Sequence, residues 1–201
     1  MLAVEERAEG DDERMIVSGF ATTYNEPYLL YSDDDLEVWE QVDARAFDDC
    51  DMNDVIMQYN HEGRVFARTK NNTLELDSQN EGLFIRADLG GTDIGRGLYQ
   101  EIRGGYTDKM SFGFTVDRDR REITDEREGK TKMLRTIEAI GKLFDVSAVS
   151  IPANPNTSIV SARFLDGAIE EVRAERLRAA ELETQRKRIE VRAKALGGTE
   201  K

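Results

Sequence analysis

Three side chains at well-separated positions have the types that acyl-transfer chemistry needs. Ser111 lies in DKMSFGF, His61 in YNHEG and Asp145 in LFDVSAVSIPANP. A serine hydroxyl is a poor nucleophile until a base takes its proton, and a carboxylate can hold an imidazole in the correct tautomer for that task. Because the chain order of such triads differs between folds, His–Ser–Asp is permitted. The hypothesis is therefore that the three segments form one hydrolytic site.

Each residue taken alone is a weak signal. A serine within an apolar strand and a histidine at a strand end more often satisfy local hydrogen bonds than perform catalysis. His61 is, however, the only histidine of the chain. Asp145 lies in an otherwise apolar segment, where an unpaired carboxylate is costly, so we expect it to have a buried partner. From the residues alone the pattern indicates a site without establishing an enzyme.

Other chemistries fit the sequence less well. There is no GxSxG, HExxH or phosphate-binding glycine loop, and we interpret GGTDIGRG as helix packing because it lacks the Rossmann spacing. The single cysteine, Cys50, excludes an internal disulfide and a cysteine-rich metal cluster. The aspartates among residues 48–54 lack the ligand spacing and glycine of a calcium loop and are interpreted as a solvated surface. We expect no cofactor and no metal.

Composition limits the partners. The chain has 201 residues, of which 39% are hydrophobic and 34% charged, which predicts one compact domain with an appendage. The net charge of −13 opposes non-specific binding to nucleic acid. No apolar run approaches the roughly 20 residues that span a bilayer, and the N-terminus is too acidic for a targeting peptide. We expect a soluble intracellular protein with neither nucleic acid nor membrane as a partner.

Short strands separated by turn residues predict a barrel or a sandwich. The expected strands are Met15–Tyr24, Leu36–Val42, Val55–Tyr59, Val65–Lys70, Thr73–Asp77, Gly82–Asp88, Met110–Asp117, Met133–Ala139 and Leu143–Ile151. Helices are expected over Asp43–Met52 and Thr92–Arg103, with Gly63 allowing a turn after His61. Gly95 and Gly97 weaken the second helix and so indicate close packing.

The composition changes from about Ser161 onward. Residues 164–196 are rich in Ala, Leu, Glu, Arg and Lys and predict a long helix, whose weak heptad seam Glu175 and Arg186 interrupt. The expected organisation is a flexible arm over residues 1–13, a compact domain over 14–163 and a helical tail over 164–201.

Six segments, in this order, resemble the HK97-type prohead proteases of tailed bacteriophages: VSGFATTYN, VDARAF, YNHEG, EGLFIRADL, DKMSFGF and LFDVSAVSIPANPNTSI. The resemblance covers about residues 15–160. That family is similar in fold to herpesvirus assemblins. The resemblance therefore implies an α+β, mainly β fold, in which a β-barrel with peripheral helices carries a serine protease site.

The resemblance also assigns roles to residues. It makes Ser111 the nucleophile and His61 the general base. The family's third position is usually glutamate in an EVS motif, whereas this chain has Asp145 in DVS, one methylene shorter. The assemblin third member is a histidine, which a chain with one histidine does not supply. A second departure is Arg45, which stands where the family commonly has glycine.

The implied function is a serine endopeptidase of capsid maturation. It would act inside the phage prohead in the host cytoplasm, cleaving the scaffold or the scaffolding region of the major capsid protein as well as itself, and be absent from or degraded in the mature virion. The tail over 164–201 would direct it to the scaffold and would be a candidate for self-cleavage near residues 157–167. A packing or homo-oligomerisation helix is the other interpretation of this tail. The alternative function is a non-enzymatic assembly factor that binds capsid protein through this helix.

Overall fold

The computed structural model describes residues 2–5, 14–127 and 130–150, together with 174, 177–178, 181–182 and 184–189. The chain divides into two compact units, Met1–Val160 and Ser161–Lys201. The described residues between 174 and 189 are helical. The long C-terminal helix is not shown as one element, because most of residues 164–201 and all of the proposed cleavage region 157–167 lie outside the described residues.

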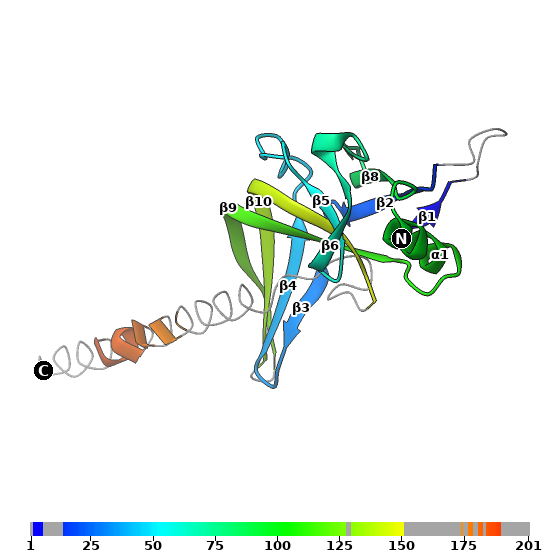
Figure 1. Cartoon of the computed structure of the whole chain (residues 1–201). Coiled ribbons are helices and arrows are strands. Elements are labelled where there is room, and N and C mark those ends of the chain that lie inside the picture. The colour runs from blue at the N-terminus through cyan, green and yellow to red at the C-terminus, as the bar shows by residue number, and fades with distance from the viewer. Residues whose placement is uncertain are drawn as a thin grey trace, which may run out of the picture. The chain divides into compact units, whose positions relative to one another are not determined.

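Two sheets form the first unit (Figure 1). The first sheet has the order β1 (Ala3–Val4), β2 (Ile16–Thr23), β8 (Gly82–Asp88) and β7 (Leu74–Ser78). The second has the order β3 (Tyr28–Ser32), β4 (Leu36–Val42), β10 (Lys130–Val149), β5 (Ile56–Tyr59) and β6 (Glu62–Arg68), and β9 (Lys109–Arg127) pairs with β10. The mainly β prediction is confirmed. Both sheets are open in the described part of the chain, so the predicted β-barrel is not confirmed, because no closed barrel is formed there.

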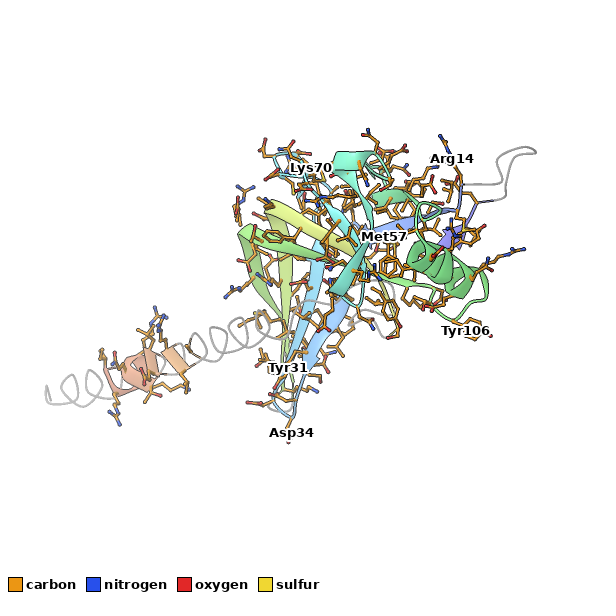
Figure 2. All side chains as sticks on the ribbon, in the orientation of Figure 1. Arg14, Tyr31, Asp34, Met57, Lys70 and Tyr106 are labelled. Carbon is orange, nitrogen blue, oxygen red and sulfur yellow. The ribbon has the colours of Figure 1, made fainter. Side chains whose placement is uncertain are left out.

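The two sheets share one apolar core. Val17 and Ile85 of the first sheet gather in the same buried cluster as Met57 and Phe112 of the second. Figure 2 shows Met57 lying inside the β-rich unit, whereas the Tyr106 side chain lies at the surface. The alternation of apolar residues that predicted these strands therefore corresponds to one face of each sheet turned toward this core.

The helix α1 (Asp93–Arg103) packs against β1 and β6 and contributes Leu98 and Ile102 to the core. Thr92 caps it by accepting a hydrogen bond of 3.1 Å from the Gly95 N–H. A Cβ on Gly95 would lie 2.2 Å from the Leu89 carbonyl oxygen, so close packing is confirmed there. It is wrong for Gly97, where a Cβ would meet nothing within 4 Å.

The predicted helix over Asp43–Met52 is wrong, because this segment consists of turns that end in an isolated bridge from Asp51 to Lys142. The side chain of Asp43 accepts a hydrogen bond of 2.9 Å from the backbone N–H of Arg45. Aspartates that bind nearby backbone N–H groups favour turns over helix interiors. Arg45 is not among the described residues with positive φ, so a side chain fits where the resembling family has glycine.

The most extended element is β10, where the sequence predicted two strands. Its first half, Thr131–Ile137, pairs in parallel with β4, and its second half, Asp145–Ala148, pairs in parallel with β5. Its other edge pairs with β9 from Lys130 to Val149, with several register shifts. Gly141 lies inside this strand, next to the Asp117 carboxylate. A Cβ there would lie 2.3 Å from Asp117 Oδ1.

A buried ion pair crosses the first half of β10. Glu40 of β4 is fully buried, and its Oε2 lies 2.9 Å from Arg135 Nη1. The Tyr28 hydroxyl donates to Glu40 Oε1 at 2.5 Å, and Arg135 Nε also contacts the Asp119 carboxylate. Burial raises the pKa of Glu40, against the lowering effect of Arg135. The network joins β3, β4, β10 and β9, and the charge on Glu40 depends on Arg135 to balance it.

Replacing Arg135 by methionine tests this dependence. We expect Arg135→Met to lower the free energy of unfolding at pH 7 by about 3–5 kcal/mol, because it leaves Glu40 buried without its cation. The exposed pair Arg118–Glu138 gives the control, since Arg118→Met should cost less than about 1 kcal/mol. Urea unfolding measures both, and equal losses in the two variants would contradict the prediction.

The same variant has a predicted pH dependence. The pKa of Glu40 is raised in the folded state, so the folded protein takes up this proton before the unfolded chain does. The contribution of Glu40 to stability therefore grows as the pH falls through its folded-state pKa. Part of the loss in Arg135→Met should be recovered on mild acidification, and that recovery should be absent in the double variant Glu40→Gln/Arg135→Met.

Candidate active site

Three adjacent strands bring the candidate residues together. Ser111 lies on β9, Asp145 lies on β10, and His61 lies in the turn after β5. Because β10 pairs with β9 on one edge and with β5 on the other, residues 50 and 84 positions apart in sequence become neighbours in space. The second half of β10 is thus the element that positions the site.

The three side chains form a continuous hydrogen-bonded chain. Ser111 Oγ lies 2.6 Å from His61 Nε2, and His61 Nδ1 lies 2.6 Å from Asp145 Oδ2. Ser111 is fully buried and Asp145 is 8% exposed, whereas the His61 side chain keeps 20% of its surface exposed. When Nδ1–H donates a hydrogen bond to the carboxylate, Nε2 carries no proton and accepts a hydrogen bond from the serine hydroxyl. The arrangement is therefore able to take a proton from Ser111.

Strand alternation explains why Ser111 is part of this chain. Its neighbours Met110 and Phe112 point into the apolar core, and both are fully buried. Successive side chains of a strand face opposite sides, so Ser111 and Gly113 lie on the other face of β9. Across the ladder their partners are Ser147 and Asp145 of β10. The apolar residues of MSFGF fix the strand in the core and thereby direct the serine to the site.

An irregularity in β10 aims Asp145. Leu143 pairs with Phe114 and Asp145 pairs with Gly113, which leaves Phe144 as an extra residue on β10. In a regular strand Leu143 and Asp145 would share one face. The extra residue allows Leu143 to join the core while Asp145 faces His61, and Phe144 itself is 46% exposed. Bulges commonly re-aim side chains next to functional sites in this way.

His61 lies in a tight turn that joins β5 to β6. Asn60 and His61 have φ values of 51° and 58°, and Tyr59 pairs with Glu62. Two consecutive left-handed residues are typical of the two-residue hairpin turn whose twist matches the strands. A histidine in this region costs on the order of 1 kcal/mol, so its surroundings must hold it there. The turn is earlier than predicted, because Gly63 already belongs to β6.

Two further residues, which sequence reasoning missed, fix the Asp145 carboxylate. The fully buried Ser147 donates a hydrogen bond of 2.6 Å to Asp145 Oδ2, the oxygen that also contacts His61. A Cβ on Gly113 would lie 2.3 Å from Asp145 Oδ1, so only glycine leaves room for this oxygen. The sequence held a signal for both residues. Ser147 lies two positions after Asp145 and Gly113 two positions after Ser111, and residues two apart share one face of a strand.

Other reactive groups lie outside this arrangement. Burial raises the pKa of the Cys50 thiol to about 11, so this cysteine is a protonated, weak nucleophile at neutral pH. A polar cavity of about 570 Å³ is lined by acidic side chains, among them Asp48, Asp49 and Glu138, together with Arg45 and Arg118. Within the described residues no group of three or more His, Cys, Asp or Glu side chains is arranged to hold a metal ion.

The described helices include none that is both long and apolar enough to cross a membrane.

Substitution of Gly113 tests how the carboxylate is held. The methyl group of Gly113→Ala should displace Asp145, lengthen its contact with His61 and cost about 1–3 kcal/mol of stability by overpacking. Proton NMR gives a direct measurement, because the single histidine gives one imidazole Nδ1–H signal. We expect this signal to be strongly downfield in the wild type and to move upfield or vanish in the variant.

The control for this substitution is Gly97→Ala in α1, where a Cβ meets nothing within 4 Å. This change should leave the imidazole signal in place and stabilise the protein by up to about 1 kcal/mol. An unchanged signal in Gly113→Ala would show that the carboxylate does not depend on the space beside Gly113.

Comparison with known proteins places the chain in a family. The family model described as caudovirus prohead serine protease matches residues 2–170. No curated protein matches the chain, and no solved structure matches it either. The family match includes all three hydrogen-bonded residues and covers well over half of the 201 residues. The chain therefore belongs to the caudovirus prohead serine protease family.

Proposed function

We propose that this protein is the endopeptidase of phage capsid maturation, with Ser111 as nucleophile, His61 as general base and Asp145 as the orienting carboxylate. The observation that carries the proposal is the unbroken hydrogen-bonded chain from Ser111 Oγ through the imidazole to Asp145 Oδ2. Membership of a serine protease family supplies the class of reaction. The geometry supports the assignment of roles within it.

The reaction divides into two acyl transfers. Ser111 Oγ attacks the peptide carbonyl while His61 Nε2 takes the hydroxyl proton, and the imidazolium then returns this proton to the leaving amine. Water, deprotonated by the same imidazole, next attacks the ester and releases the acid product and Ser111. Through both steps Asp145 Oδ2 faces Nδ1 at 2.6 Å, where it stabilises the imidazolium and maintains the tautomer.

The shorter side chain of aspartate is compatible with the third role. The carboxylate occupies the space beside Gly113, and Ser147 donates to the same oxygen that His61 contacts. The extra residue Phe144 turns Asp145 toward the imidazole. Together these features support aspartate as the third member, because they leave room for its carboxylate and orient it at 2.6 Å from the imidazole.

Family membership implies a phage capsid protein as substrate and the interior of the prohead as the site of action. We propose more specifically that the enzyme removes the scaffold or the scaffolding region of the major capsid protein and trims itself within residues 157–167. Under this proposal the tail over 164–201 directs the enzyme to the scaffold and is lost with it, and the protease is absent from or degraded in the mature virion. A dimeric or larger assembly through the same tail is compatible with this proposal.

The decisive variant is Ser111→Ala. We expect it to abolish cleavage of co-expressed capsid protein and to leave the intact mass of the protease at that of the full chain. Loss of one triad member lowers the rate by about 10⁴-fold or more, and His61→Ala combined with Ser111→Ala should cost little beyond either alone. Asp145→Asn should also lower the rate strongly, because it favours the wrong tautomer. Ser18→Ala on β2 is the matched control.

Processing by Ser111→Ala at the wild-type rate would overturn the proposal and favour the non-enzymatic assembly factor. Circular dichroism should show an intact fold in each variant. A fluorophosphonate probe adds a test that needs no substrate: mass spectrometry should find its label on Ser111 of the wild-type protein and on no residue of His61→Ala.

Thiol reagents separate serine chemistry from cysteine chemistry. With its pKa raised to about 11, Cys50 should have about 100-fold less thiolate at neutral pH than a thiol of the ordinary pKa of 9.0. Iodoacetamide should therefore alkylate Cys50 slowly, and complete alkylation should leave fluorophosphonate labelling of Ser111 unchanged. Labelling that falls in step with alkylation would contradict the separation.

A further inference from the structure

The turn that carries His61 is attached to β10 by the residue before it. The backbone N–H of Asn60 donates a hydrogen bond of 2.9 Å to the Ala148 carbonyl oxygen. Its side-chain Oδ1 accepts from the Ser150 N–H at 3.1 Å and from the Ser150 hydroxyl at 3.3 Å. Both main chain and side chain of Asn60 therefore bind the end of the strand that also carries Asp145.

These bonds hold the turn at Asn60 and His61, whose backbone has an unfavourable conformation. Asn60 and His61 are both left-handed, with φ values of 51° and 58°, a conformation that residues other than glycine adopt at a cost. If the turn relaxed to ordinary φ values, the imidazole would leave the position in which Nδ1 meets Asp145 and Nε2 meets Ser111. The bonds to Ala148 and Ser150 oppose that relaxation.

We propose that Asn60 is a positioning residue, whose side chain holds the turn against the end of β10 and so keeps His61 in its left-handed, hydrogen-bonded position. The inference rests on the proposed role of His61 as general base. Asn60 touches no reacting atom and acts only through the imidazole. Since a misplacement of about 1 Å can cost 10²-fold in rate, a side chain that prevents such a shift has a measurable effect.

Three substitutions at this position separate the two contributions of asparagine. Asn60→Gly keeps the freedom to adopt positive φ and loses the side-chain bonds to Ser150. Asn60→Asp keeps tolerance of positive φ and retains an oxygen that accepts from the Ser150 N–H. Asn60→Ala loses both. Asn72→Gly is the matched control, because Asn72 is also left-handed, with φ 58°, but lies in an exposed surface turn after the short 3-10 helix Thr69–Asn71.

The first readout is the rate at which a fluorophosphonate labels Ser111. We expect Asn60→Gly to lower this rate about 10- to 100-fold, Asn60→Ala to lower it at least as much, and Asn60→Asp to restore it to within about threefold of the wild type. Asn72→Gly should leave it unchanged. Labelling of Asn60→Gly at the wild-type rate would overturn the inference, as would equal losses in Asn60→Gly and Asn60→Asp.

The second readout does not require activity. The single imidazole should give a sharp downfield Nδ1–H signal in the wild type, in Asn60→Asp and in Asn72→Gly, and a broadened or upfield signal in Asn60→Gly. A sharp, unshifted signal in Asn60→Gly contradicts the inference even if Ser111 proves not to be the nucleophile. Conversely, a wild-type protein that shows the expected signals but never labels Ser111 refutes the proposed function and leaves the positioning role of Asn60 supported.

Discussion

The pairing of β10 with a different partner on each edge is the constraint on which the site depends. One edge is bonded to β9, which carries Ser111, and the other to β5, which leads into His61, while Asp145 belongs to β10 itself. Strand pairing brings the three segments side by side, and the turn at His61 and the extra residue Phe144 then aim the side chains. The hydrogen bonds of 2.6 Å at His61 therefore depend on sheet register together with the turn that carries the imidazole.

Burial on the core face makes that register firm. Met110, Phe112 and Val146 are fully buried in the cluster shared by both sheets, and Phe112 stacks on Phe114 with ring centroids 4.5 Å apart. A slip of one residue would move these side chains to the polar face and place Ser111 and Ser147 in the apolar core, where their hydroxyls would lose their partners. In the first half of β10, Glu40 and Arg135 are partners across the β4–β10 ladder. The positions of the three candidate residues therefore depend on core residues that take no part in the chemistry.

Sequence reasoning recovered the features that depend on local pattern. Apolar alternation located most strands, and the helix expected over Thr92–Arg103 is present as α1. The chemistry of the candidate residues selected Ser111 and Asp145, which both lie within hydrogen-bond distance of the imidazole of His61. What it missed depends on long-range pairing. β10 is one strand because it pairs with β9 along its length, and the need for glycine at position 113 follows from Asp145, its partner across that ladder. The prediction of a helix over 43–52 was wrong for a local reason. The Asp43 side chain binds the backbone N–H of Arg45, and such bonds favour a turn over a helix.

The extra residue at Phe144 has a consequence for how this sequence can vary. The Phe144 side chain is half exposed, so many residue types would fit at this position. The presence of a residue between Leu143 and Asp145 that has no partner on β9 nevertheless decides which face of β10 carries Asp145. Removal of one residue here would restore regular alternation and send either the carboxylate into the apolar core or Leu143 out of it. In the segment LFDV, the number of residues matters more for the direction of Asp145 than the residue type at position 144. Relatives that preserve the site should tolerate substitution at this position far more readily than a gap.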